Sequence, residues 1–152
     1  MTGVVFRAAR REDVAAIVAL LANDIRGNGR EDASLPLDPR YFAGFEAIEA
    51  SGCNELIVGT VEERVVACAQ LTFIPGLSSI GATRAMIEGV RVAETMRGRR
   101  IGEQLIGHLV AKARVARCHT VQLTTNKTRK DAHRFYARIG FVNSHEGFKL
   151  EL

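Results

Sequence analysis

The stretch Met96–Ile106, MRGRRIGEQLI, lies between a segment with strand-like composition and a segment with helical periodicity, and this position decides the fold class. The residues before it, Ala85–Val92, are typical of a β-strand. Apolar residues recur at i, i+4 steps through Ile101–Ala116, which predicts an amphipathic helix. Thr120–Thr124 is typical of a further strand. A strand, a helix and a strand in this order predict a parallel βαβ crossover in a mixed α/β fold.

The segments before the crossover predict two helices and an antiparallel hairpin. A short strand at Val4–Arg7 precedes a helix that begins with Glu12 and Asp13, whose carboxylates favour a helix N-terminus. Asn28–Pro39 is rich in Gly, Asp and Pro, which predicts a loop. The second helix carries Tyr41, Phe42, Phe45 and Ile48 on one side. The hairpin strands are Leu56–Val61 and Val65–Phe73, joined by a polar turn.

The remaining segments predict one more helix and two terminal strands. The helix spans Asp131–Ile139 and is closed by Gly140, which stands where a left-handed C-cap is expected. Phe141-Val142 and Phe148–Leu152 are the predicted terminal strands. The chain of 152 residues has the length of one domain, 1–152, with a central sheet of about six to seven strands and about four helices.

Composition excludes several classes of protein. Apolar residues make up 47% and charged residues 25% of the chain, as in ordinary globular proteins. No apolar run approaches the ~18 residues of a membrane span, and the amino terminus lacks the apolar core of a secretory leader. We therefore expect no membrane partner and a cytoplasmic location. Cys53, Cys68 and Cys118 form no CxxC pair, so we expect buried reduced thiols and no bound metal.

The net charge of +4 conceals an asymmetry along the chain. Residues 1–83 contain 7 Lys and Arg against 11 Asp and Glu, a net of −4, whereas residues 84–152 contain 14 against 6, a net of +8. This pattern fits a protein that holds an anion at one end and a cation at the other, or a basic surface for nucleic acid. Aromatic residues are not interleaved with the basic ones and no reader motif is present, so we expect no nucleic-acid partner.

Three arginines and two glycines stand at the start of the crossover helix, within Arg97–Gly102. A helix N-terminus carries unpaired N–H groups and about half a positive charge, so an arginine there costs roughly 0.3–1 kcal/mol. A bound diphosphate would offset this cost through charge-assisted bonds. A solvated basic turn is the alternative, and these residues alone do not separate the two. No Walker-type GxxxxGK(S/T) or dinucleotide-type GxGxxG sequence is present.

Val90-Arg91-Val92 followed by Arg97–Gly102 resembles the acyl-CoA-binding motif Q/R-x-x-G-x-G/A of the GNAT N-acetyltransferases. Asn126–Phe141, NKTRKDAHRFYARIGF, resembles the second motif of that family, with an Asn at a strand end and a helix that ends in FYxxxGF. The opening FRAARREDVAAIVALL is similar to its first strand and helix. Arg100 stands where the motif usually has its first Gly. The backbone N–H does the binding, so an Arg with ordinary helical dihedrals would still supply it.

The resemblance implies a single-domain GNAT-like fold that uses acetyl-CoA as cosubstrate. It implies that the strand holding Val90–Val92 splays from the strand Val121–Thr125, so that the pantetheine arm enters the gap. The N–H groups of Arg99 through Gly102 would hold the pyrophosphate, and Asn126 would bond the pantetheine or a water. The implied cofactor-binding residues are Val90, Arg91, Val92, Arg97, Gly98, Arg99, Arg100, Ile101, Gly102, Asn126 and Tyr136.

The resemblance also implies transfer of an acetyl group to a primary amine of a small molecule or peptide by direct attack. Tyr136 matches the usual general acid for the thiolate; a core tyrosine is the alternative. Glu88, a charge inside an apolar strand, is either the base for the amine or a group that binds it. His108, His133 and His145 are weaker base candidates.

The acceptor should be a cationic amine. The acidic residues that would attract it are Asp24, Glu31, Asp32 and Asp38. Tyr41, Phe42 and Phe45 either wall its site or pack in the core. A non-catalytic acyl-CoA-binding or sensing module is the alternative function, and the family makes a homodimer plausible.

Overall fold

The structure is a computed structural model that describes residues 3–24 and 29–152. The chain divides into two compact units, Met1–Gln122 and Leu123–Leu152, and each is described by itself. Asn28, the first residue of the predicted loop, lies outside the described residues, and residues 29–38 contain no helix and only an isolated bridge at Glu31.

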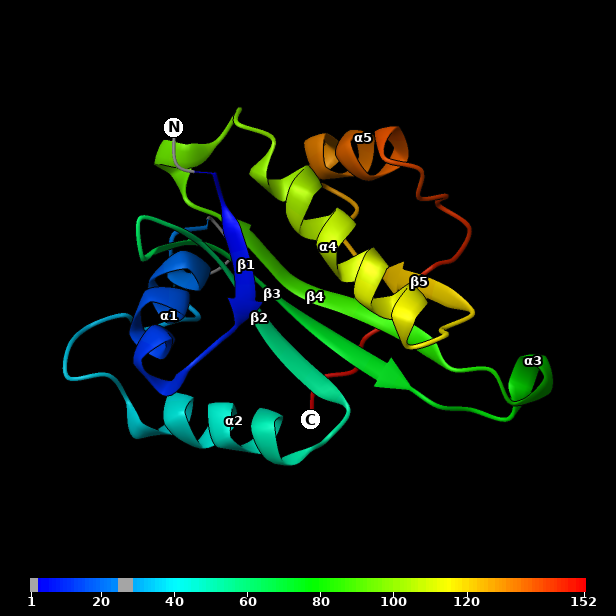
Figure 1. Ribbon diagram of the computed structural model, residues 1–152, viewed down its shortest axis with the longest axis horizontal. Helices are drawn as coiled ribbons and strands as arrows, with labels where there is room; N and C mark the ends of the chain where they lie inside the picture. The colour runs from blue at the N-terminus through cyan, green and yellow to red at the C-terminus, as the bar shows by residue number, and fades with distance from the viewer. Residues whose placement is uncertain (1–2, 25–28) are drawn as a thin grey trace. The chain divides into compact units, whose positions relative to one another are not determined.

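The first unit contains the sheet and most of the helices (Figure 1). Its elements in chain order are β1 (Val5–Ala8), the 3-10 turn η1 (Arg11–Asp13), α1 (Val14–Ala22), α2 (Pro39–Ala50), β2 (Asn54–Val61), β3 (Arg64–Ile74), α3 (Ser78–Gly81), β4 (Arg84–Val92), η2 (Glu94–Met96), α4 (Ile101–Val115) and β5 (Thr120–Leu123), whose last residue opens the second unit. The strand order in the sheet follows the chain, β1-β2-β3-β4-β5.

The sheet is mixed, as the crossover predicts. The pairs β1–β2, β2–β3 and β3–β4 are antiparallel. At the fourth pair, the His119 N–H donates to the Thr83 carbonyl at 2.7 Å, and the Gln122 side chain lies 3.9 Å from the Met86 sulfur. Both contacts join residues at the same sequence offset, so β5 runs parallel to β4 and α4 is the crossover helix.

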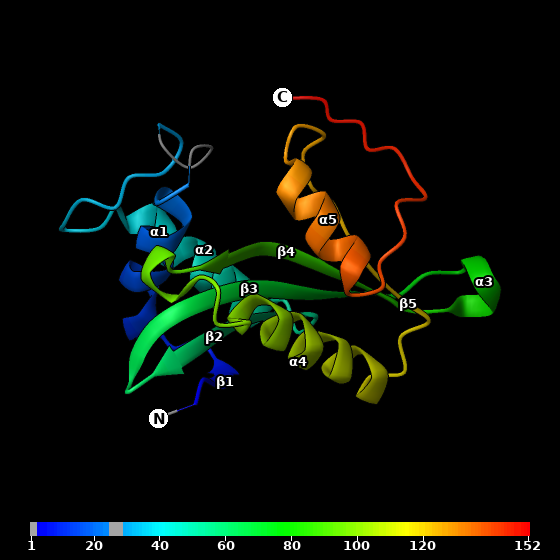
Figure 2. The same ribbon diagram turned by 90° about the horizontal axis from the view of Figure 1, so that it is seen from above.

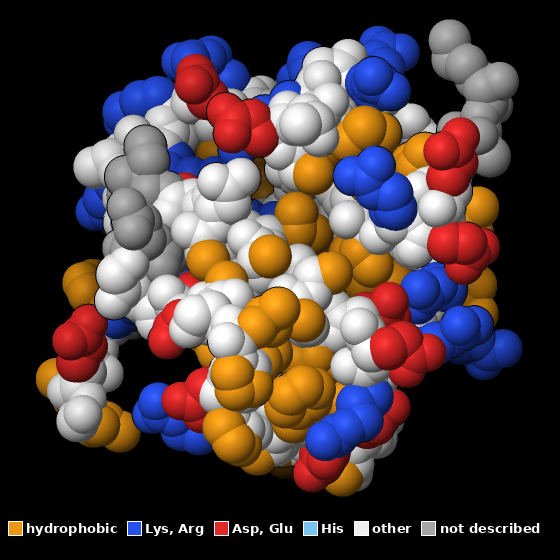
Figure 3. Space-filling view, turned by 90° about the vertical axis from the view of Figure 1, so that its left-hand side faces the viewer, with side chains coloured by type: hydrophobic (Ala, Val, Ile, Leu, Met, Phe, Trp, Pro, Cys, Tyr) orange, Lys and Arg blue, Asp and Glu red, His pale blue; other side chains and the backbone are white. Residues whose placement is uncertain are grey.

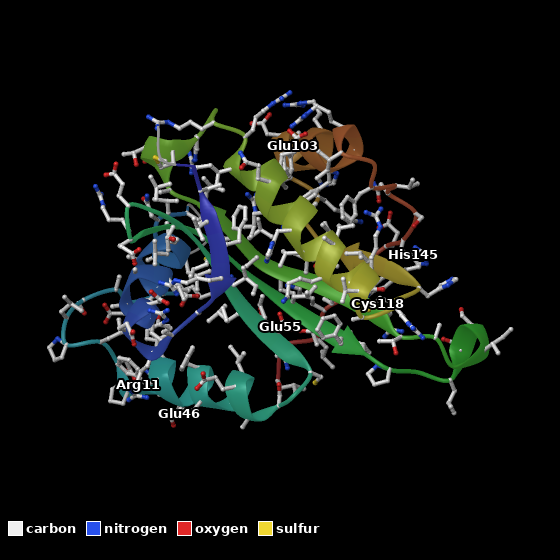
Figure 4. The ribbon with its side chains drawn as sticks, viewed as in Figure 1. Arg11, Glu46, Glu55, Glu103, Cys118 and His145 are labelled. Atoms are coloured by element: carbon white, nitrogen blue, oxygen red, sulfur yellow. The ribbon has the colours of Figure 1, made fainter. Side chains whose placement is uncertain are left out.

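Helices cover both faces of this sheet (Figures 1 and 2). Val58 of β2 packs with Ile17 of α1 on one face. Glu55, three residues earlier on β2, points to the opposite face, because side chains alternate along a strand. There its Oε2 lies 2.9 Å from the Nζ of Lys112 on α4 (Figure 4). The fully buried side chains of Leu105 and Leu109 on α4 extend the core on that face.

An ion pair fixes the start of α1 against β1. Arg7 of β1 bonds both carboxylate oxygens of Asp13, at 2.6 and 3.0 Å, and the Arg10 N–H donates to the same carboxylate at 2.7 Å. The hydrogen bond from Arg7 lowers the pKa of Asp13. The predicted acidic helix start is therefore correct, but Asp13 is held by a neighbouring strand and not only by the helix dipole.

The second unit, Leu123–Leu152, contains α5 (Lys130–Arg138) and the segments before and after this helix. Gly140 has φ of 102°, and the Phe141 N–H donates to the Tyr136 carbonyl at 3.0 Å. This is the left-handed helix ending predicted at Gly140.

The number of strands differs from the prediction. The described residues form five strands instead of six to seven, and residues 141–152 have no regular secondary structure. The predicted strands Phe141-Val142 and Phe148–Leu152 are therefore wrong; the Phe148 side chain is 96% exposed. A strand forms only where a neighbouring strand pairs with its backbone. The alternation of polar and apolar side chains does not show which segment that neighbour is. The part of the chain that the structure describes has five α-helices, against the expected number of about four, because α3 is an additional short turn.

Candidate active site

The turn between β4 and α4 is an exposed basic loop. Arg97, Gly98, Arg99 and Arg100 are all exposed, and Gly98 has a left-handed φ of 77°. The first hydrogen bond of α4 runs from the Gln104 N–H to the Arg100 carbonyl at 3.0 Å, and the Arg100 side chain does not cap the helix. The first turn of α4 therefore has no side-chain cap and directly follows three exposed arginines, as an anion site requires.

Arg100 adopts a conformation that the sequence did not predict. Its φ of 59° and ψ of 18° are left-handed and differ from the ordinary helical dihedrals considered for an Arg at this position. The chain must reverse direction between the extended backbone of Arg97 and the first turn of α4, and the left-handed residue makes that bend. A left-handed conformation costs an L-residue about 1–2 kcal/mol, which explains why a glycine suits this position.

Replacing Arg100 with Gly is therefore expected to stabilise the protein. The free energy of unfolding should rise by about 0.5–1 kcal/mol, because glycine removes the strain but has more freedom in the unfolded chain. Only a weak contact is lost, since the exposed Arg100 lies 3.9 Å from Glu103 in the first turn of α4 (Figure 4). Chemical denaturation measures the change. The matched control is Arg99→Gly, which removes the same charge at a residue without positive φ; equal stabilities of the two variants would contradict the explanation.

A β-bulge interrupts β4 between the two segments implicated by the sequence. Cys68 pairs with Arg91 and Gln70 pairs with Glu88, so β4 has one more residue than β3 in this interval. Gly89 lies in the bulge with a left-handed φ of 62°. The Gly89 carbonyl accepts a weak bond from the Cys68 thiol at 3.7 Å. The bulge separates Glu88 from the Val90–Val92 strand end and re-aims the residues on either side of it.

The side chain of Arg91 is engaged inside the first unit. Its Nη2 lies 3.1 Å from Oδ2 of Asp24, and its Nη1 donates to the Val90 carbonyl at 2.8 Å. Both charged side chains of the pair are less than one-fifth exposed. A contribution of Arg91 to cofactor binding would therefore come from its backbone, because its guanidinium already has an anionic partner.

The four acidic residues expected to attract the amine all have partners of their own. Besides Asp24, Glu31 accepts a bond from the Tyr41 hydroxyl at 2.9 Å, and Asp32 accepts two bonds from Ser34. Asp38 caps α2 and pairs with Arg40 at 2.7 Å. Figure 3 shows charged side chains of both signs interspersed over this side of the molecule. Neighbouring arginines therefore balance the charges of Asp24, Glu31 and Asp38, whereas the partner of Asp32 is the neutral Ser34.

Glu88 differs from these residues. It is exposed on β4, and among residues 3–24 and 29–152 its carboxylate has no hydrogen bond or ion pair. Its cross-strand neighbour is Gln70 of β3, directly opposite on the same face. Unlike the four acidic residues above, Glu88 thus has a carboxylate that is available to bind an amine.

The aromatic residues of α2 belong mainly to the core. Phe45 is 5% exposed and packs with Val14 and Val18 of α1. Tyr41 and Phe42 are half-buried against the same cluster. Core packing is therefore the role of Phe45, the alternative that the sequence had left open for this residue.

Asn126 and Tyr136 both lie in the second unit. The Asn126 Oδ1 accepts bonds from the N–H and the hydroxyl of Thr128, at 3.0 and 2.9 Å, so the side-chain amide nitrogen is the group left to bind a ligand. The Tyr136 ring is half-buried on α5, with edge contacts to Phe135 and Phe141 at centroid distances of 5.1 and 5.8 Å. These contacts fix the plane of the phenol.

His108 and Cys68 are poorly suited to acid–base or nucleophilic chemistry. The His108 ring packs on Phe6 at 5.3 Å, and burial lowers the pKa of His108, so it does not lie on a solvated face. Burial raises the pKa of Cys68 to about 12, which makes its thiol inert. Cys53 and Cys118 are free and half-buried, so only Cys68 is buried as expected.

The described parts of the chain contain neither a metal-binding cluster nor a membrane-spanning helix. No three His, Cys, Asp or Glu side chains gather there closely enough to hold a metal ion. None of the helices there has the length and apolar character to cross a membrane.

The fold and the turn define a class: mixed α/β proteins in which a basic, uncapped helix N-terminus follows a bulged strand. The model of the acetyltransferase (GNAT) family matches residues 15–141 and runs through both units. The chain belongs to this family, as the two motifs indicated.

Three relatives describe its place in the family. A crystal structure named a transcriptional regulator, from Bacillus halodurans C-125, has a TM-score of 0.96 and 42% identity over 99% of this chain and 100% of that chain. A structure from Agrobacterium tumefaciens, provisionally named an acetyltransferase, has a TM-score of 0.85 and 29% identity over 97% and 99%. Aminoalkylphosphonate N-acetyltransferase of Salmonella typhimurium is 44% identical over 66 residues, which span 43% of this chain and 43% of that enzyme.

Proposed function

We propose that the chain is an acetyl-CoA-dependent N-acetyltransferase, one domain over residues 1–152, that modifies the primary amine of a small molecule or peptide. The observation that carries the proposal is the exposed basic turn Arg97–Arg100 before α4 in a chain of this family. Uncapped N–H groups at a helix start, beside guanidinium groups, are suited to a diphosphate such as that of CoA. Dimerisation and a cytoplasmic location stay predictions.

The residues divide the binding task between backbone and side chains. The N–H groups of Arg99, Arg100, Ile101 and Gly102 would bind the pyrophosphate, and the exposed arginines would add long-range attraction. The backbone of Val90–Val92 and the side-chain amide nitrogen of Asn126 would bind the pantetheine arm. Acetyl-CoA, when bound, supplies the acetyl thioester.

Two side chains would manage the protons. Glu88 would accept a proton from the ammonium of the acceptor at its carboxylate, directly or through water, so that the nitrogen lone pair is free to attack. Tyr136 would donate the proton at its Oη to the leaving sulfur. This pair of roles needs no metal ion and no covalent intermediate on the protein.

A thiol-release screen tests the proposal. The protein is incubated with acetyl-CoA and a panel of amines that includes aminoalkylphosphonates, aminoglycosides, polyamines and amino acids, and products are identified by mass spectrometry. Acetylation of at least one amine, above the rate without protein, is expected. Acetyl-CoA and CoA should each raise the melting temperature; absence of turnover together with no thermal shift would refute the assignment.

A non-catalytic acyl-CoA sensor is the second candidate function. The observation that favours it is that the relative with 42% identity is named a transcriptional regulator. A thermal shift with acetyl-CoA in the absence of turnover on every amine would identify this function instead.

A further inference from the structure

A row of polar side chains crosses β2 and β3 on the face that holds Glu88. Asn54, Gln70 and Thr72 are half-buried in strands whose other members are mostly apolar. The Asn54 Oδ1 accepts a bond from Gln70 Nε2 at 3.1 Å and one from the Thr72 hydroxyl at 2.5 Å. None of these three residues was predicted from the sequence to belong to a site. The sequence feature that could have identified them is a polar residue inside an otherwise apolar strand. Only the strand register shows that the three side chains contact one another.

The hydrogen bonds fix which way each amide points. The Ser51 hydroxyl donates its single proton to the Ile48 carbonyl at 2.8 Å, so its oxygen must accept from the Asn54 side chain at 2.9 Å. The Asn54 Nδ2 therefore faces Ser51, and its Oδ1 faces Gln70. Gln70 must then donate with Nε2. Its Oε1 is left as an acceptor directed away from Asn54.

Gln70 and Glu88 form a pair of acceptors. They are directly opposite on β3 and β4, where Cβ atoms are typically about 4.5–5.5 Å apart. One N–H of the Gln70 amide donates to Asn54, and within the described residues no hydrogen bond joins Gln70 to Glu88. Within the described residues, the Gln70 Oε1 and the Glu88 carboxylate have no donor. An acceptor pair of this kind needs a ligand with several N–H groups and a positive charge, which an alkylammonium provides.

We propose that Gln70 and Glu88 together bind the ammonium group of the acceptor amine, with Ser51 and Asn54 holding Gln70 in the required orientation. This inference rests on the proposed function and assigns its acceptor site. Glu88 supplies the charge, whereas Gln70 supplies a second, neutral acceptor that fixes the direction of the nitrogen. The specificity is then for cationic primary amines over neutral isosteres.

The test compares Gln70→Leu with the wild type, using the best ammonium acceptor from the amine panel. Loss of a hydrogen bond to a charged group should raise the acceptor KM about 10- to 100-fold. The KM for acetyl-CoA should not change. The inhibition constant of an analogue with a methyl group in place of the ammonium should also stay constant, because that analogue makes no bond to Gln70. Gln104→Leu, the same substitution on the exposed face of α4, is the matched control.

The outcomes separate the two proposals. A wild-type protein that acetylates no amine overturns both. A wild type that acetylates amines while Gln70→Leu keeps the acceptor KM overturns the acceptor site alone. A parallel rise in the KM for acetyl-CoA, or in the inhibition constant of the methyl analogue, would show a general structural effect and also overturn it. Ser51→Ala frees the Asn54 amide to turn, and should give a smaller rise in the acceptor KM at an unchanged melting temperature.

Discussion

Replacing Tyr136 with Phe is expected to lower kcat by about 100- to 1,000-fold, the usual contribution of a positioned general acid. The substitution removes the phenolic hydroxyl, which carries the proton, whereas a phenylalanine ring keeps the edge contacts with Phe135 and Phe141. The dissociation constant for acetyl-CoA should therefore change little. Steady-state kinetics and calorimetric titration with acetyl-CoA measure the two quantities separately.

The chain offers a matched control in its second tyrosine. The Tyr41 hydroxyl bonds Glu31 and accepts the Asp32 N–H at 2.9 Å, so Tyr41→Phe also removes one hydroxyl but in a different environment. Tyr41→Phe should lower the melting temperature and leave kcat nearly unchanged. An unchanged kcat in Tyr136→Phe would exclude Tyr136 as the acid.

Replacing Glu88 with Gln is expected to have the second-largest effect, a loss of roughly 100-fold in kcat/KM for the acceptor near neutral pH. The loss should be greatest at low pH, where almost all of the amine is protonated and needs a base. It should shrink as the pH approaches the pKa of the amine, because the free base then reaches the site without help. A pH profile of kcat/KM for both proteins measures this trend.

Separate pH profiles of kcat and of the acceptor KM distinguish the two roles of Glu88. A base gives a deficit in kcat that depends on pH, whereas a pure binding group gives a rise confined to the acceptor KM. Glu49→Gln on the exposed face of α2 is the control for loss of a carboxylate. If Glu88→Gln matches this control at every pH, Glu88 has no part in the reaction.

Local patterns predicted the parts of the fold that local physics determines. The i, i+4 spacing in Ile101–Ala116 gave a helix that the structure places at Ile101–Val115, and the flanking strands gave the parallel crossover. The helix end at Gly140 was predictable because glycine is the residue that most readily adopts the left-handed conformation of a helix C-cap. The terminal strands were not predictable, since strand formation depends on a partner that the segment itself does not encode.

The site was predicted only where it follows a motif. The turn before α4 was found from its glycines and arginines, but the left-handed Arg100 was not, because residue type gives only a weak preference for backbone dihedrals. The engagement of Asp24 by Arg91 joins residues far apart in the sequence. Gln70 was missed for the same reason: its meaning depends on the strand register opposite Glu88.

The bulge at Gly89 makes β4 sensitive to the deletion of a residue. Residues three apart on a regular strand lie on opposite faces, yet Glu88 and Arg91 lie on the same one, because their partners Gln70 and Cys68 are two apart on β3. The alternation of side chains between the two faces of the sheet is therefore shifted by one residue across the bulge, where β4 has one residue more than β3. Deleting that residue would restore the regular alternation and move the side chain of either Glu88 or Arg91 to the opposite face of the sheet. In this segment the count of residues is as strongly constrained as their identity.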